Sequence, residues 1–113
     1  MADRDAVLNR RTDPRRAVRV PATLVYRDAV WQVQALDLGR DGICVVAPRP
    51  FEPGSHCTVT LDVPLLEGPV TVTLSLKTIY SSYAATDAFK IGGRFVELDA
   101  KAADLLGRFV AGD

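Results

Sequence analysis

The sequence is poor in the side chains from which metal centres and catalytic sites are usually built. Its 113 residues include two cysteines and one histidine, His56, too few for a Cys/His zinc site or a histidine-centred catalytic set. No apolar run approaches the length of a transmembrane helix, and residues 1–19 lack the apolar centre of a signal peptide. We therefore expect no enzyme, no metal site and no membrane insertion, and we expect a cytoplasmic protein.

The sequence also lacks net charge, because fourteen Lys and Arg residues balance fourteen Asp and Glu residues. A general DNA- or RNA-binding domain is usually basic throughout. Binding of single-stranded RNA by a small barrel needs exposed aromatic residues on a strand face. The positions that we expect to face outward are mostly Thr, Ser, Gln and Lys, so DNA and RNA are not expected partners.

Cysteine is too scarce for a disulfide framework. Cys44 and Cys57 both lie in apolar runs, and we expect two small buried side chains rather than a disulfide. The composition, with 48% hydrophobic and 25% charged residues, is that of a soluble globular protein. The length suits one domain that buries about two-thirds of its unfolded surface.

What the sequence does contain is a series of short strand patterns. From Arg19 onward, apolar residues recur at every second position, which is the period of a half-buried β-strand. Pro and Gly interrupt the pattern, and we expect loops at 48–54, 64–69 and 81–87. The expected strands are 19–27, 31–35, 43–47, 57–63, 70–80 and 89–95.

After Asp99, which can cap a helix, the apolar residues change to helical spacing from Ala102 to Val110. Six short strands followed by a helix predict a mainly β fold, a six-stranded antiparallel small β-barrel with a C-terminal α-helix. Residues 1–18 are polar and show no periodic apolar face. We expect them to form a flexible Arg-rich N-terminal arm before a barrel domain at 19–113.

The first candidate segment for ligand binding lies where the arm meets the first strand. Arg15, Arg16 and Arg19 fall within five residues. A guanidinium binds phosphate through paired hydrogen bonds and also stacks on aromatic rings. Two such groups four residues apart suit a ligand that carries phosphates and bases, although a solvated basic arm is the alternative.

The second candidate segment, residues 37–42, lies between the expected second and third strands. Gly39 and Gly42 allow positive φ angles and let a ligand approach the backbone closely. The Asp37 carboxylate offers two acceptors that suit the N1–H and N2–H2 edge of guanine. A Gly-rich hairpin turn, with Asp37 bonded to its own backbone, is the alternative.

Taken together, the two segments resemble the signature of the PilZ family of cyclic di-GMP receptors. That signature is an R-x-x-x-R segment, here at 15–19, followed by D/N-x-S-x-x-G, here D-x-G-x-x-G at 37–42. The resemblance extends to the Gly-Arg-Phe-Val run at 93–96, which is similar to the family's last strand, and to the helix that follows.

The resemblance implies a ligand and a role for each matching residue. The ligand is cyclic di-GMP, whose phosphates and guanine bases would be held by Arg15 and Arg19, with Arg16 assisting. Asp37 would read a guanine edge, and Gly42 would keep the turn open. The resemblance implies no catalytic residue and no metal.

The sequence departs from the family pattern at Gly39, which stands where the family has serine. A lost neutral hydrogen bond costs about 1 kcal/mol, or about fivefold to tenfold in affinity, so we expect weakened rather than abolished binding. Gly39 remains part of the expected site. An overlapping pair, Arg11 and Arg15, gives the arm an alternative register.

The function that the resemblance implies is that of a bacterial receptor. It would bind cyclic di-GMP, order its N-terminal arm on binding and signal through a downstream effector protein. The alternative is a degenerate PilZ-like protein-interaction module that does not bind nucleotide. A metal set of Asp37, Asp41 and Asp62 is disfavoured, because carboxylates at strand ends are usually solvated. The alternation phase of Tyr80 favours a core position over stacking on a base.

Overall fold

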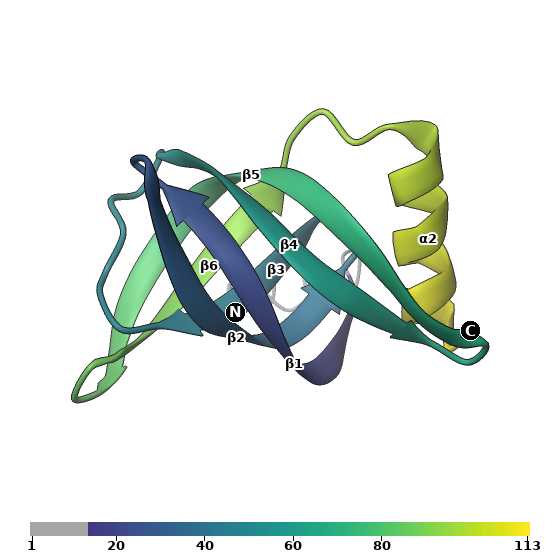
Figure 1. Cartoon of the computed structure of the whole chain (residues 1–113), viewed down its shortest axis with the longest axis horizontal. Helices are drawn as coiled ribbons and strands as arrows, with labels where there is room; N and C mark the ends of the chain where they lie inside the picture. The colour runs from purple at the N-terminus through teal and green to yellow at the C-terminus, as the bar shows by residue number, and fades with distance from the viewer. Residues whose placement is uncertain (1–13) are drawn as a thin grey trace, which may run out of the picture.

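The computed structural model describes residues 14–113, which form six β-strands and one α-helix (Figure 1). The strands are β1 (Arg15–Tyr26), β2 (Ala29–Gly39), β3 (Gly42–Ala47), β4 (His56–Leu65), β5 (Gly68–Ala85) and β6 (Ala88–Phe95), and the helix is α2 (Ala100–Ala111). Neighbouring strands are antiparallel and close into a barrel in the order β1-β2-β3-β6-β5-β4. The predicted fold class, an antiparallel six-stranded barrel with a C-terminal helix, is confirmed.

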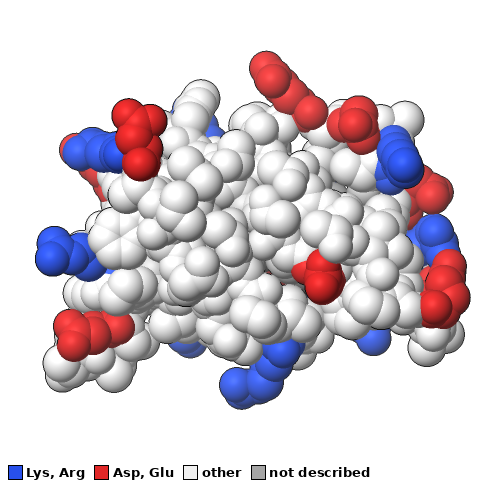
Figure 2. All heavy atoms as spheres, in the orientation of Figure 1, with Lys and Arg blue, Asp and Glu red and all other residues white. Residues whose placement is uncertain are grey.

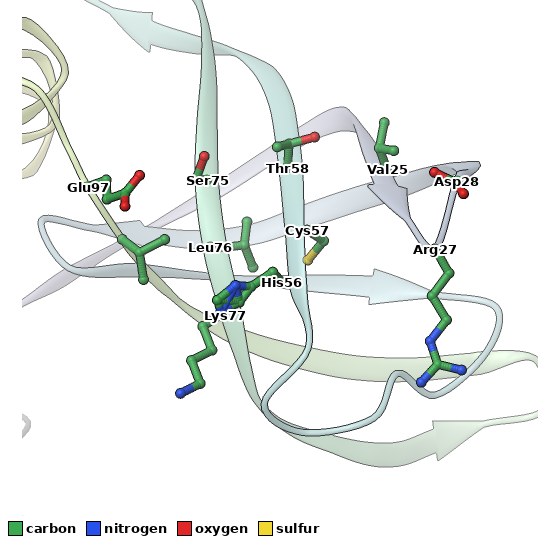
Figure 3. A pocket seen from close by; sticks show the side chains of 11 residues that line it. Val25, Arg27, Asp28, His56, Cys57, Thr58, Ser75, Leu76, Lys77 and Glu97 are labelled. Atoms are coloured by element: carbon green, nitrogen blue, oxygen red, sulfur yellow. The ribbon is translucent and has the colours of Figure 1, made fainter.

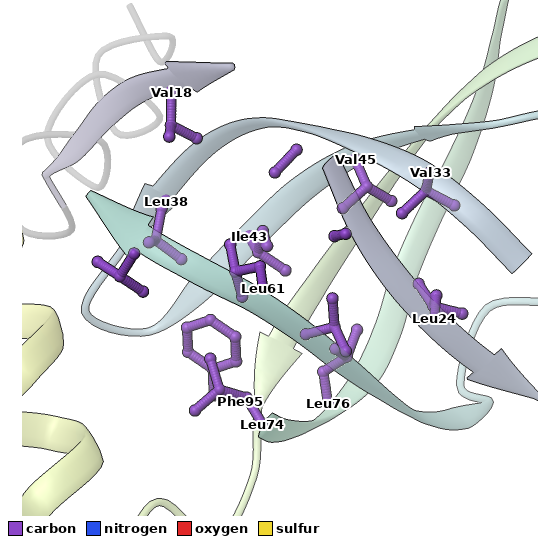
Figure 4. Packing of buried hydrophobic residues seen from close by; sticks show 14 of the residues in the cluster. Val18, Leu24, Val33, Leu38, Ile43, Val45, Leu61, Leu74, Leu76 and Phe95 are labelled. Atoms are coloured by element: carbon purple, nitrogen blue, oxygen red, sulfur yellow. The ribbon is translucent and has the colours of Figure 1, made fainter. Parts of the chain in front are cut away.

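The interior of the barrel is filled by alternate side chains of its strands (Figure 4). Strand β4 shows the pattern most clearly, because every second residue from Cys57 to Leu65 is buried and those between are not. Cys44 and Cys57 are buried and free, as predicted. Burial raises the pKa of the Cys57 thiol to about 11, so this side chain stays protonated near neutral pH and acts as an apolar packing residue.

Strand β1 begins earlier than predicted. The expected boundary between arm and barrel lay after residue 18, whereas residues 15–18 belong to β1. Arg15 faces Gly39 and Ala17 faces Asp37 across the β1–β2 ladder, so backbone pairing extends the strand beyond the apolar alternation. The expectation that residues 15–18 belong to the arm is therefore wrong. The rest of the expected arm, residues 1–13, lies outside the described residues.

The predicted loop between β4 and β5 is almost entirely strand, with a turn at 66–67. Pro64 and Pro69 face each other within the β4–β5 ladder. Each lies beyond the part of its strand that has a second partner, since β4 pairs with β1 through Thr58–Leu61 and β5 pairs with β6 from Leu76 onward. The missing N–H donors therefore cost no ladder hydrogen bond, and the strands run through both prolines.

The loop predicted at 81–87 is shortened in the same way, because β5 continues to Ala85 and pairs there with Ala88 of β6. The β5–β6 register shifts between Thr78 and Tyr80 and again between Tyr83 and Ala85. Each shift changes which side chains point outward. Local alternation in the sequence cannot reveal such a change, because it depends on the partner strand.

Helix α2 closes one end of the barrel, where it packs against β1, β2 and β4 (Figure 1). Its start is fixed by Asp99, as predicted, because the carboxylate accepts a hydrogen bond from the Ala102 N–H at 2.7 Å. The face turned to the barrel buries Leu105, Leu106 and Phe109. The helix is therefore held on the barrel by an apolar stripe, and its polar contacts lie at the edges of that stripe.

Candidate functional site

The two candidate segments lie side by side at the start of β1 and the end of β2. Antiparallel pairing places Arg15 opposite Gly39 and Ala17 opposite Asp37, although the segments are far apart in the sequence. Arg15 Nη1 donates a hydrogen bond to Asp37 Oδ1 at 2.9 Å, and each of the two side chains is 35% exposed. The structure thus joins one residue of each segment in a half-exposed ion pair on the outside of the barrel.

Gly42, the first residue of β3, lies directly beneath this pair. A Cβ at Gly42 would lie 2.3 Å from the Gly93 carbonyl oxygen and 2.9 Å from Arg15 Nη2, distances that no side chain can occupy. Among the described glycines, those with positive φ are Gly54, Gly68 and Gly112. The expectation that Gly39 and Gly42 serve positive φ angles is therefore wrong, and at Gly42 the requirement is close approach.

Arg16 points away from the other candidate residues. Adjacent residues of a strand face opposite sides, and Arg16 lies against α2 while Arg15 lies against Asp37. Arg16 Nη1 donates a hydrogen bond to the Phe109 carbonyl oxygen at 2.5 Å, and its guanidinium carbon lies 4.4 Å from the centre of the Phe109 ring. In this structure Arg16 therefore binds the helix, and its role toward a ligand stays a prediction.

Arg19 is exposed on β1, in the stretch between Ala17 and Val20 where the β1–β2 register shifts. Within residues 14–113 the structure gives Arg19 no hydrogen bond or ion pair to Asp37. Arg19 lies on the same strand as Arg15 and near its start. The structure therefore unites Arg15, Asp37 and Gly42, and the place of Arg19 in the site also stays a prediction.

Tyr80 borders this face, contrary to its expected core position. The register shift after Thr78 turns Tyr80 outward, where it is 46% exposed. Its ring covers Gly92, at which a Cβ would lie 2.2 Å from the ring, and its hydroxyl lies 3.8 Å from Cys44 Sγ. Burial raises the pKa of the Cys44 thiol and of the Tyr80 hydroxyl. Paired glycines inside a strand pattern, here 92–93, were the available signal of such close contact.

Cross-strand register places these residues in one row on the outer face. Asp37 faces Cys44, Cys44 faces Gly92, and Gly92 faces Tyr80. Directly opposed residues project to the same side of a sheet. The candidate site is therefore a surface that crosses β2, β3, β6 and β5. Stacking of a base on Tyr80, the disfavoured alternative in the sequence analysis, is not tested by the structure.

The opposite side of the barrel offers phosphate fewer contacts. Figure 2, in which β1, β4 and β5 lie toward the viewer, shows acidic and basic side chains mainly around the edge and a largely uncharged centre. Threonine hydroxyls pair with each other there, as Thr60 and Thr73 do at 2.8 Å. Such a face supplies few of the cationic donors that bind a phosphate strongly.

A groove of about 650 Å³ lies on the barrel wall over the start of β4, between the end of β1 and residues 75–77 of β5 (Figure 3). The charged residues that line it carry both signs and are Arg27, Asp28, His56, Lys77 and Glu97. Arg27 is already in an ion pair with Glu52 at 2.6 Å. The groove includes no residue of the two candidate segments, so we do not assign it as the ligand site.

A PilZ domain family model matches residues 9–112. The chain belongs to the PilZ family. Among solved structures, the PilZ domain of YcgR from Escherichia coli, determined with c-di-GMP, has a TM-score of 0.71 and 14% identity, over 90% of this chain and 89% of that chain. No curated protein sequence matches the chain.

Two longer proteins contain the same PilZ fold. The inhibitor of motility MotI/DgrA from Bacillus subtilis has a TM-score of 0.76 and 14% identity, over 90% of this chain and 49% of that one. PlzA from Borreliella burgdorferi, in complex with c-di-GMP, has a TM-score of 0.59 and 14% identity, over 96% of this chain and 44% of that one. The match to this chain therefore covers about half or less of the length of each of these two proteins.

Within residues 14–113 of this PilZ chain, no group of three or more His, Cys, Asp or Glu side chains could hold a metal ion. In the same part of the chain, no helix has the length and apolar character needed to cross a membrane.

Replacing Gly42 by alanine is expected to destabilise this PilZ domain by about 1–3 kcal/mol. The added methyl group would lie 2.3 Å from the Gly93 carbonyl oxygen, so β3 and β6 must move apart. Gly107→Ala is the control, because its methyl group would meet the end of the flexible Arg40 side chain at 3.4 Å and alanine favours a helix. Urea unfolding followed by Trp31 fluorescence measures both, and equal free energies of unfolding for Gly42→Ala and the wild type would contradict the close contact.

Proposed function

We propose that this PilZ domain is a receptor, not an enzyme, and that it binds cyclic di-GMP on the outer face of the barrel at Arg15, Asp37 and Gly42. The observation that carries the proposal is the 2.9 Å contact between Arg15 and Asp37, which joins the two family segments on accessible surface. Membership of the PilZ family supports it. Two of the related structures, the YcgR PilZ domain and PlzA, are complexes with c-di-GMP.

The proposed ligand offers what these side chains recognise, because it carries two phosphates and two guanine bases. Without ligand, Arg15 and Asp37 form a hydrogen-bonded ion pair with each other. Since both are 35% exposed, their ion pair is worth about 0–1 kcal/mol, and a ligand can replace it at small cost. Arg15 then binds a phosphate or stacks on a guanine, while Asp37 accepts hydrogen bonds from a guanine edge. Gly42 is buried beneath the Arg15 guanidinium, and its lack of a side chain lets Arg15, and a ligand that Arg15 binds, lie close to the backbone.

Ligand binding at the site is transmitted to α2 through the start of β1. Arg16 follows Arg15 directly and donates a hydrogen bond to the Phe109 carbonyl oxygen of α2. A ligand that draws Arg16 and the preceding arm toward its phosphates removes this contact and loosens the end of α2. The ordered arm and the altered helix together form the surface that a downstream effector protein reads.

A second candidate function, that of a PilZ-like interaction module without nucleotide, is favoured by one residue. Gly39 supplies no hydroxyl at the position where the family pattern has serine. In that case the contact between Arg15 and Asp37 is a structural ion pair of the β1–β2 ladder, and partner proteins bind without a ligand. The two functions differ in their response to added cyclic di-GMP.

Titration calorimetry with cyclic di-GMP separates the two functions. The wild type is expected to bind saturably, and Arg15→Ala and Asp37→Ala are each expected to weaken binding by about tenfold or more, because each removes a charged hydrogen-bonding group. Asp62→Ala is the control, since Asp62 is an exposed carboxylate that binds Thr71 on the β4–β5 hairpin. A flat wild-type titration would contradict the receptor and favour the interaction module.

Restoring the family serine gives a gain-of-function test. Gly39→Ser is expected to tighten cyclic di-GMP binding by about fivefold to tenfold, because it adds one neutral hydrogen bond. The measurement is the dissociation constant by calorimetry, with the unfolding midpoint as a check on stability. Unchanged or weaker affinity in a folded Gly39→Ser protein would contradict the assigned role of this position.

Hydrogen exchange tests the route to α2. Cyclic di-GMP is expected to speed exchange in the last turn of α2, because the Arg16–Phe109 contact is lost, and to leave the buried amides of β3 unchanged. Arg16→Ala is expected to give the faster exchange without ligand. If α2 exchanges at the same rate with and without a saturating ligand, the helix is not part of the response.

A further inference from the structure

The cross-strand register that builds the candidate site continues beyond it. Gly42 faces Arg94 in β6, Arg94 faces Lys77 in β5, and Lys77 faces His56 in β4. Directly opposed residues project to the same side of the sheet, which here is the outer face that carries Arg15 and Asp37. We call Arg94 and Lys77, which are both exposed, the cationic row.

The cationic row begins one strand away from the site. Neighbouring strands are about 4.8 Å apart, so the Arg94 backbone lies about 5 Å from Gly42 and the Lys77 backbone about 10 Å from it. Gly42 adds no side chain to the surface between them, and the Arg15 guanidinium lies above it from the other side. A ligand that rests over Gly42 therefore has cations on both flanks.

The cations of the row are not used elsewhere in the described structure. Within residues 14–113, the ion pairs of arginine involve Arg15, Arg27 and Arg108, and no ion pair is formed by Arg94 or Lys77. The acidic neighbours are Asp41, which precedes Gly42, and Glu97, which lines the same groove as Lys77 (Figure 3). In that view the Lys77 side chain extends away from Glu97.

We propose that Arg94 and Lys77 form a second phosphate-binding subsite beside the Arg15–Asp37 pair, an inference that rests on the proposed function. A single phosphate is served by Arg15. A second phosphate, carried past Gly42, meets the charged donors of the cationic row, which bind it in charge-assisted hydrogen bonds. The second phosphate belongs either to the same cyclic dinucleotide or to a second molecule stacked on the first. The chemistry of the subsite is the same for both.

Calorimetric titration of the full chain with cyclic di-GMP tests the subsite. Arg94→Gln and Lys77→Gln are each expected to weaken binding by about tenfold, because each removes a charged hydrogen bond to phosphate. Both residues are exposed, so the variants keep the fold. Lys101→Gln is the matched control: it removes the same charge from an exposed lysine in the first turn of α2, beside residues 70–73 of β5 and away from the site.

The outcomes are distinct. A loss of affinity in both row variants at unchanged stoichiometry assigns the second phosphate to the same molecule, whereas a fall in stoichiometry from two to one assigns it to a second molecule. If the wild type binds and Arg15→Ala weakens binding, but both row variants behave like Lys101→Gln, the subsite is wrong and the proposed function stands. A flat wild-type titration overturns both.

Discussion

The structure depends above all on the register of the β1–β2 ladder. Leu38 is fully buried and pairs with Arg16, so Asp37 and Gly39 on either side of it must face outward. A slip of one residue would expose Leu38 and bury the Asp37 carboxylate, which is costly on both counts. The apolar core thus fixes the outward position of Asp37, and the same ladder brings Arg15 to it.

The same constraint separates the two adjacent arginines. Because β1 alternates, Arg15 reaches the outer face while Arg16 reaches the end of the barrel that α2 covers. Arg40, in the second segment, also touches the helix, since its guanidinium lies against Gly107. Each candidate segment therefore has one side chain on α2. In the proposed function, a movement of either segment would change how the helix is held, without a long chain of intermediate contacts.

The sequence alone was sufficient to predict the features that depend on residues close together in the chain. The six-stranded fold, the Asp99 cap and the two buried cysteines follow from periodicity and capping, which depend on neighbouring residues in the chain. The pairing of Arg15 with Asp37 agrees with the family resemblance, which assigned both residues to one site. Composition and spacing alone did not predict their contact.

The sequence predictions that were wrong have a common physical cause, because each concerns a feature that is set by the partner strand. Strand β1 reaches back to Arg15 through its pairing with β2, and Pro64 and Pro69 stay in strands because they lack a second neighbour. The Tyr80 side chain points outward instead of into the core because the β5–β6 register shifts just before it. The opposite assignments of Arg15 and Arg16 could have been anticipated from strand alternation, had the strand been expected to begin there.

Zero net charge is compatible with an anionic ligand because charges in solution act over short distances. At physiological ionic strength the screening length is about 8 Å. The Arg27–Glu52 and Arg108–Glu67 pairs each cancel locally. A ligand over Gly42 is therefore influenced mainly by nearby charges, among them Arg15, Arg94, Lys77, Lys90, Asp37 and Asp41. In the proposed complex, a guanine edge engages Asp37, and the other charges on that face are mostly positive. The balanced charge elsewhere would give the phosphate backbone of a nucleic acid no extended contact, so in the proposed function a local positive face serves a small ligand rather than nucleic acid.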